Sequence, residues 1–199
     1  MNKVQGKIKE EISVIWHSRA GQGAVTAANT LATILGEEGK YVQSFPEFGA
    51  EKRGAPVKVF NRISDSDILK VSIVRNPDFV ILLDTSLAIN ELSYEEITKG
   101  MTNNSVLLIN TSQDHTKFEE IFDGNIFHCD ASKISLEEIG RDIPNVPILS
   151  AFLGIAHPEN DSEAYLEKIR ENLSDLPGKI IEGNLLAFKR GFKEVKKIQ

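Results

Sequence analysis

The sequence predicts an α/β protein in which helices cover both faces of a mixed but mostly parallel sheet. Short apolar runs alternate with helix-forming segments, which is the rhythm of a doubly wound sheet. Two runs, 79–83 and 106–110, are almost continuously apolar, as is typical of strands that are covered on both faces. The 199 residues contain no internal repeat and no long linker. We therefore expect one domain, residues 1–199, with a Rossmann-like three-layer sandwich and a hairpin insertion.

The expected elements follow in chain order from the apolar pattern. Strands are predicted at 12–16, 41–45, 57–63, 79–83, 106–110 and 126–129. A further strand at 68–74 is expected to pair with 57–63 as a hairpin through the turn Asp65-Ser66-Asp67. Helices are predicted after the glycines near residue 23, at 148–156 after a loop between Pro144 and Pro147, and at 162–172. In the last helix, Ile181, Leu185, Phe188, Phe192 and Val195 form one stripe that we expect to pack on its own domain, although a partner contact stays open.

Composition excludes several classes of protein. The formal net charge of -6 argues against general nucleic-acid binding, which requires a basic surface. The single cysteine, Cys129, allows neither an intrachain disulfide nor a C-x-x-C metal site. The first 11 residues lack the apolar core of a signal peptide, and no apolar run approaches the roughly 20 residues that span a bilayer. We expect a cytoplasmic protein without a membrane partner.

A glycine-rich turn stands between the first strand and the first helix. Gly21 and Gly23 are spaced as in the dinucleotide motif G-x-G-x-x-G, but Thr26 replaces the third glycine and no clear acidic residue ends the second strand. A dinucleotide site is therefore disfavoured. Two interpretations stay open: the glycines only form the turn, or their backbone N–H groups bind an anion together with Arg19.

A second dense segment, FPEFGAEKRGAP, covers residues 45–56. Arg53 is a candidate phosphate ligand, or it pairs with Glu51 or with an acid of a neighbouring subunit. Exposed aromatic rings beside an arginine are typical of protein interfaces. The candidate binding or interface residues are Arg19, Gly21, Gln22, Gly23, Phe48, Arg53 and Gly54.

No catalytic or metal-binding residue is predicted. His17 has no evident nucleophile beside it and is expected to form a structural hydrogen bond. The histidines at 115, 128 and 157 are scattered, without metal-ligand spacing. Cys129 is expected to be a small buried residue, and Asp84 is expected to cap the segment that follows it.

The two dense segments resemble the gamma subunit of 2-oxoacid:ferredoxin oxidoreductases, of which pyruvate:ferredoxin oxidoreductase is the best-known member. The resemblance rests on HSRAGQGAVTAA at 17–28 and FPEFGAEKRGAPVKVFNRISD at 45–65, and it continues through 77–84, 144–149 and 184–191. Ser18 and Ala20 stand where the family usually has glycine, and their Cβ atoms restrict positive φ angles.

The resemblance implies a reaction and a set of partners. A 2-oxoacid and coenzyme A would give acyl-CoA and carbon dioxide, with the electrons passed to ferredoxin. Thiamine diphosphate and iron–sulfur clusters would belong to alpha, beta and delta-type subunits, while this chain would be an accessory subunit without a cofactor. Arg19, Arg53 and the Gly21/Gly23 turn would contact coenzyme A phosphates or order the subunit interface.

Two alternatives remain: a free-standing Rossmann-type nucleotide-binding protein and a purely structural assembly module. Pyruvate is the expected substrate of the complex; 2-oxoisovalerate, 2-oxoglutarate and indolepyruvate stay open.

Overall fold

A computed structural model describes residues 11–48, 54–70, 72–113 and 116–198. These residues form a seven-stranded mixed sheet with the order β2-β3-β1-β4-β5-β6-β7. The neighbouring strands β1, β4, β5 and β6 are parallel, and β2 shares their direction because both β2 and β1 run antiparallel to β3. The strands are β1 (Glu11–Arg19), β2 (Tyr41–Phe48), β3 (Pro56–Ser64), β4 (Phe79–Leu82), β5 (Val106–Asn110), β6 (Asn125–Cys129) and β7 (Lys196–Lys197).

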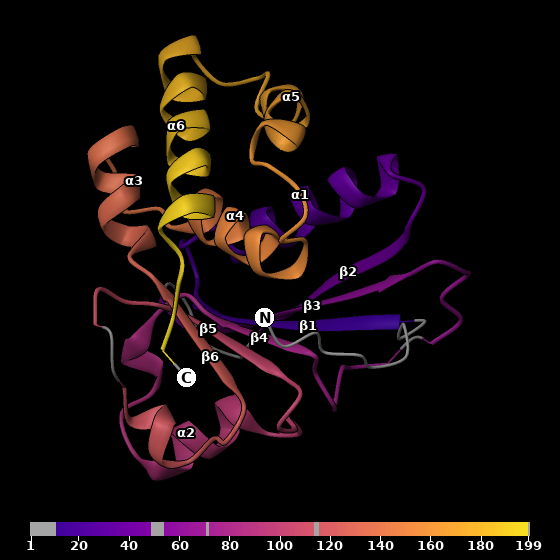
Figure 1. Ribbon diagram of the computed structural model, residues 1–199, viewed down its shortest axis with the longest axis vertical. Helices are drawn as coiled ribbons and strands as arrows, with labels where there is room; N and C mark the ends of the chain where they lie inside the picture. Colours follow the sequence, from indigo (N-terminus) through magenta and orange to yellow (C-terminus); the bar gives the residue numbers. More distant parts are fainter. Residues whose placement is uncertain (1–10, 49–53, 71, 114–115, 199) are drawn as a thin grey trace.

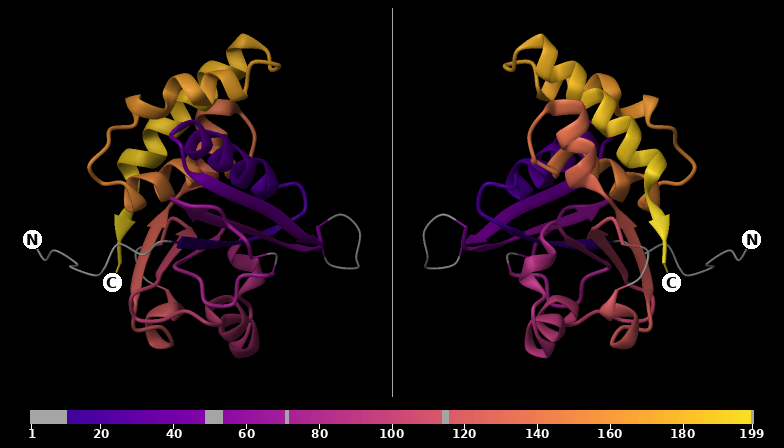
Figure 2. Two further views of the ribbon diagram at one scale, coloured as in Figure 1. Left: turned by 90° about the vertical axis from the view of Figure 1, so that its right-hand side faces the viewer. Right: turned by 90° about the vertical axis from the view of Figure 1, so that its left-hand side faces the viewer.

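The helices lie in two unequal layers on the two faces of the sheet. Figure 1 shows α1, α3, α4, α5 and α6 on one face, called here the upper face, and α2 on the other. The two side views in Figure 2 show the same three layers, which confirms the predicted sandwich. The helices are α1 (Ala24–Glu37), α2 (Glu91–Thr98), α3 (Ala131–Ile139), α4 (Asn145–Ala156), α5 (Glu163–Asn172) and α6 (Gly178–Glu194), with 3-10 turns η1 (Thr85–Leu87) and η2 (Lys117–Glu120).

The hairpin insertion is present, but its partners differ from the prediction. β3 pairs with β2 on one side and with β1 on the other, so both of its edges are occupied. The described residues of 68–74 therefore form no strand, and that part of the prediction was wrong. The segment around residue 72 is bonded to a side chain of β3 instead of to its backbone. Arg62 Nη2 donates to the carbonyl oxygens of Ser72 at 3.0 Å and Ile73 at 3.4 Å.

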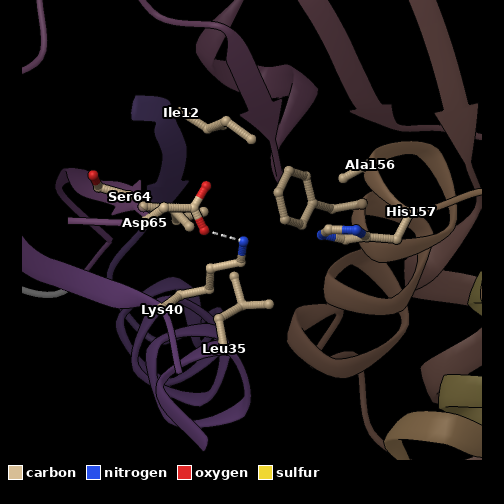
Figure 3. Close-up of a pocket in the computed structure, with 9 residues that line it drawn as sticks. Ile12, Leu35, Lys40, Ser64, Asp65, Ala156 and His157 are labelled. Atoms are coloured by element: carbon tan, nitrogen blue, oxygen red, sulfur yellow. Dashed lines mark hydrogen bonds and ion pairs between the residues drawn. The ribbon is translucent and has the colours of Figure 1, made fainter. Parts of the chain in front are cut away.

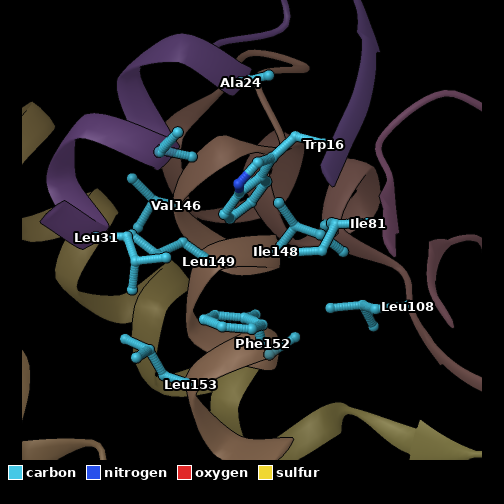
Figure 4. Packing of buried hydrophobic residues seen from close by; sticks show 14 of the residues in the cluster. Trp16, Ala24, Leu31, Ile81, Leu108, Val146, Ile148, Leu149, Phe152 and Leu153 are labelled. Atoms are coloured by element: carbon cyan, nitrogen blue, oxygen red, sulfur yellow. The ribbon is translucent and has the colours of Figure 1, made fainter. Parts of the chain in front are cut away.

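The upper core lies between the sheet and α1, α4 and α6. In Figure 4 Trp16 of β1 faces the apolar side chains of α4, and its ring centroid is 6.1 Å from that of Phe152. The indole Nε1 of Trp16 donates to Asn61 Oδ1 at 2.7 Å, and Asn61 Nδ2 donates to the carbonyl oxygen of Ala28 at 3.1 Å. One buried hydrogen-bonded pair thus joins β1, β3 and α1 inside an apolar core.

The stripe of the last helix packs on its own domain, as expected. Leu185 and Phe188 are buried in the upper core, and Ile181, Phe192 and Val195 pack against it. The lower core, between the sheet and α2, is smaller and includes Ile15, Phe60, Val80 and Ile97.

Candidate functional site

The glycine-rich turn lies at the carboxyl edge of the parallel strands. After β1 the chain passes to α1 on the upper face, whereas after the neighbouring strand β4 it passes to α2 on the lower face. Neighbouring parallel strands whose chains leave to opposite faces open a crevice between their carboxyl ends, and open α/β sheets bind ligands at that place. The predicted candidates are therefore located where this fold places ligands.

A hydrogen-bonded network fills the inner part of this crevice. Gln22 Oε1 accepts from the backbone N–H of Arg19 at 2.8 Å, and Gln22 Nε2 donates to Asp84 Oδ2 at 2.8 Å. Arg19 Nε donates to Ser86 Oγ at 2.9 Å and lies 3.4 Å from Asp84 Oδ2. The network ties the ends of β1 and β4 together, so that Arg19 and Gln22 hold the turn in place.

Asp84 is the ionised centre of this network. Burial on its own would raise the pKa of Asp84, but hydrogen bonds from Ser86 and Gln22 and the charge of Arg19 outweigh burial and lower it. The carboxylate also accepts from the backbone N–H of Ser86 at 2.8 Å and caps η1, which confirms the expected cap.

The two dense sequence segments meet at this point. Arg19 Nη1 donates to the carbonyl oxygen of Gly54 at 3.0 Å, and the N–H of Ala20 donates to the carbonyl oxygen of Ala55 at 3.0 Å. Phe48 ends β2, with its backbone opposite Val57. Arg53 lies outside the described residues.

The N-terminus of α1 faces an open depression. Gly23 is the N-cap, no side chain caps the helix, and its first turn contains no acidic residue. Within the described chain, the N–H groups of Ala24, Val25 and Thr26 have no hydrogen-bond partner. The depression has a volume of about 340 Å³ and is lined by Ser18, Arg19, Ala20, Gly21, Gly23, Ala24, Val25, Thr26 and Val57. Free N–H groups at the positive end of a 14-residue helix suit an anion.

Both glycines of the turn are required by its geometry. Gly21 has a φ of 103° and Gly23 a φ of 81°, in the left-handed region that residues with a Cβ atom rarely adopt. A Cβ atom at position 23 would also lie 2.8 Å from the side chain of Asn145, the first residue of α4. The structure therefore supports the turn-forming interpretation of the glycines and leaves the anion-binding interpretation compatible with it.

His17 and Cys129 do not supply catalytic chemistry to this turn. Burial, followed by the charge of Lys58, lowers the pKa of His17 to about 4. The expected structural hydrogen bond of the His17 ring is not found among the described residues. Burial raises the pKa of Cys129 to about 12, as expected for an enclosed thiol. The described residues contain no cluster of three or more His, Cys, Asp or Glu residues that could hold a metal ion.

A separate cavity lies at the opposite edge of the sheet, near the start of β1 (Figure 3). It is lined by Ile12, Leu35 and the Lys40–Asp65 ion pair on one side and by Ala156 and His157 of the α4 end on the other. Its volume of about 70 Å³ has room for no more than a few water molecules. The cavity is therefore a packing gap rather than a cofactor site.

Sequence reasoning expected Asp84 to be a cap at the end of the buried run 79–83, but it did not name Asp84 or Ser86 as partners of the turn. The position of an acid directly after this run was the available signal, because such residues meet the carboxyl edge of the sheet. In the part of the chain that the structure covers, no helix has both the length and the apolar composition needed to cross a membrane.

The mixed sheet, with its parallel strands β1, β4, β5 and β6, and the anion-compatible helix end define a Rossmann-like α/β protein. A family model described as pyruvate ferredoxin/flavodoxin oxidoreductase matches residues 13–194. The chain belongs to this family and is a gamma subunit of a pyruvate (2-oxoacid):ferredoxin oxidoreductase, as its two dense segments had indicated.

Two curated relatives and one solved structure support this assignment. Pyruvate synthase subunit PorC of Thermotoga maritima is 42% identical over 195 residues, which cover 94% of this chain and 96% of that protein. The common gamma subunit of the pyruvate/ketoisovalerate oxidoreductases of Thermococcus kodakarensis is 38% identical, covering 86% and 94%. The crystal structure of the T. maritima PorC subunit superposes with a TM-score of 0.81 over 95% of this chain and 99% of the other.

Proposed function

We propose that this gamma subunit serves an assembly that converts a 2-oxoacid and coenzyme A into acyl-CoA and carbon dioxide while it reduces ferredoxin. Alpha, beta and delta-type subunits supply the thiamine diphosphate and the iron–sulfur clusters, and this chain is inactive alone. Its single cysteine is buried and cannot hold a cluster by itself. Pyruvate is the proposed substrate, because the relatives above carry pyruvate in their names.

We further propose that the glycine-rich turn borders the coenzyme A entrance. The observation that carries this proposal is the uncapped N-terminus of α1, whose free N–H groups line an open depression at the carboxyl edge of the sheet. A phosphate of coenzyme A would accept from these groups. Arg19 would act indirectly, since its guanidinium holds Gly54 and Asp84. Phe48 and Arg53 are proposed as further contacts of this chain with coenzyme A or with a partner subunit.

The test places a negative charge at the proposed phosphate site without weakening the helix. Thr26 is exposed in the first turn of α1, where an aspartate interacts favourably with the helix dipole. In the assembled complex, Thr26→Asp is expected to raise the KM for coenzyme A by about tenfold, because the new carboxylate repels the phosphate. This change corresponds to the loss of one charge-assisted hydrogen bond. Thr26→Asn has nearly the same size without the charge, and its KM is expected to stay close to that of the unsubstituted complex.

Each alternative has its own outcome. If Thr26→Asp assembles normally and its KM for coenzyme A is unchanged, the chain is a structural assembly module at this surface. Micromolar binding of NADH by the chain alone would favour a free-standing nucleotide-binding protein. Arg53→Ala with intact assembly and an unchanged KM would remove Arg53 from the coenzyme A site while leaving the helix N-terminus in it.

A further inference from the structure

A row of ionisable side chains crosses the lower face of the sheet, on the opposite side from α1. In the strand register His17 of β1 lies opposite Lys58 of β3, and Lys58 lies opposite Glu47 of β2. His17 is on the lower face because side chains alternate along a strand and Ile15 belongs to the lower core. The row forms one wall of a hollow of about 400 Å³, which is also lined by Ile15, Phe60, Ile73, Val74, Arg75, Glu96 and Lys99.

His17 contributes an imidazole ring to the wall of this hollow. The residue is 6% exposed, and its ring nitrogens have no hydrogen-bond partner among the described residues. The ring nitrogens of His17 are not among the buried unsatisfied side-chain atoms of the described residues, and His17 lines the hollow, so a ligand in the hollow could reach its ring. The neutral ring offers one N–H donor and one acceptor.

Cations outnumber acids around the hollow. Among the described residues that line it, Lys58, Arg75 and Lys99 face two carboxylates, those of Glu47 and Glu96. Glu96 is shared, because it lies 2.7 Å from Lys58 Nζ and 3.3 Å from Lys99 Nζ. The exposed Arg75 has no ion pair and no side-chain hydrogen bond within the described chain, so its guanidinium is free to take an anion.

We propose that this hollow binds a small oxyanion, a phosphate or a carboxylate, which Arg75 and Lys58 hold by charge and which the ring of His17 contacts through a hydrogen bond. The site is separate from the proposed coenzyme A entrance, because the two lie on opposite faces of the sheet. Phosphate and carboxylate share the planar or tetrahedral oxygen pairs that a guanidinium binds in a bidentate manner. The ring of His17 provides a direct probe of occupancy.

The experiment follows the histidine ring nitrogens of the full chain by NMR. Sodium phosphate and sodium malonate are titrated separately against the ¹⁵N-labelled protein at constant ionic strength. His17→Gln identifies the ring signals of His17 among the four histidines. We expect these signals to shift saturably with at least one anion, and the anion that shifts them identifies the ligand class.

Arg75→Ala tests the charge, and Lys189→Ala is the matched control. Arg75→Ala is expected to raise the dissociation constant of the anion by about tenfold, since it removes a charge-assisted contact from an exposed position. Lys189→Ala removes one charge from the upper layer, where Lys189 pairs with Glu163, and is expected to leave the affinity unchanged. Equal weakening by both variants would mean unspecific attraction. The proposal would be overturned if the His17 ring signals do not shift with either anion. It would also be overturned if the anion shifts only the N–H signals of Val25 and Thr26, at the N-terminus of α1.

Discussion

At the scale of single residues, His17 and Asp84 show how their surroundings decide the charge of a partly enclosed group. Burial is the largest influence on the pKa of both. Asp84 nevertheless stays ionised, because Ser86, Gln22 and Arg19 supply donors and positive charge. Burial and the facing charge of Lys58 lower the pKa of His17, so the imidazole stays neutral. The carboxylate thus carries a charge that orders the turn, whereas the imidazole is neutral at the wall of the hollow.

The lowered pKa of His17 predicts a loss of stability in mild acid. In the unfolded chain the imidazole takes up a proton near pH 6.5, whereas the folded chain resists protonation until about pH 4. The contribution is complete above pH 6.5 and is lost as the pH falls to about 4, a difference of roughly 3 kcal/mol. His17→Gln does not titrate and is expected to lose roughly 3 kcal/mol less across this interval, measured by urea unfolding.

His157→Gln is the matched control for this measurement. His157 is only partly buried and lies 3.4 Å from Glu159. His157→Gln is expected to lose as much unfolding free energy between pH 6.5 and 4 as the unsubstituted chain. If the stability curves of the His17 variant and the unsubstituted chain run parallel between pH 6.5 and 4, burial does not keep His17 neutral.

At the scale of elements, the turn between β1 and α1 depends on contact with a second helix. Gly21 and Gly23 both have a positive φ, but only Gly23 lies against α4, at Asn145. The free helix N-terminus that we propose as an anion site is therefore positioned by the packing of α1 against α4 as well as by the turn.

Alanine substitutions are expected to separate the cost of the positive φ angle from the cost of the contact with α4. Gly21→Ala adds a Cβ atom in open space and is expected to cost roughly 1–2 kcal/mol from the left-handed conformation alone. Gly23→Ala carries the same strain plus a clash with Asn145, and is expected to cost roughly 1–3 kcal/mol more. Denaturant unfolding measures both differences.

Asn145→Gly removes the atoms that a Cβ at position 23 would meet. It is expected to recover the extra loss of Gly23→Ala and to give no benefit to Gly21→Ala. A double variant with Gly23→Ala that recovers nothing would show that backbone strain, rather than contact with α4, decides the cost at this position.

The elements were predictable where the signal was local. Apolar runs located the six longer strands, and the final stripe located α6. The strand expected at 68–74 failed because strand partners depend on which edges are free, and β2 already occupies that edge of β3. Pro147 was placed in a loop, whereas it lies in the first turn of α4, where proline is tolerated.

The site was predictable only in part. Its glycines, Arg19 and Gln22 are adjacent in the sequence and could be named. Their partners Asp84, Ser86 and Asn145 come close only when β1 lies beside β4 and α1 beside α4. The environment of His17 has the same origin, because its burial and its place opposite Lys58 are properties of the assembled sheet.

At the scale of the whole molecule, the two faces of the sheet are unequally supported. On the upper face, α4 is buried from Val146 to Leu153. On the lower face, Ile97 is the buried residue of α2, and Leu92 of the same helix is 76% exposed. Segments with few buried apolar contacts open at a lower free energy than the global unfolding free energy. The helix α2, which contributes Glu96 to the proposed oxyanion hollow, should therefore be the less stable part of the fold.

Hydrogen exchange is expected to measure the difference in stability between α2 and α4. Two variants test its cause. In the unsubstituted chain the amides of α2 should exchange faster than those of α4. Ile97→Ala should accelerate the exchange of the α2 amides by at least about tenfold and leave those of α4 unchanged, because it removes the buried residue by which α2 packs in the lower core. Ile148→Ala, in the fully buried part of α4, should accelerate both helices, since it weakens the global unit. Equal protection of the two helices, with Ile97→Ala accelerating both by one factor, would mean that the layers unfold as a single cooperative unit.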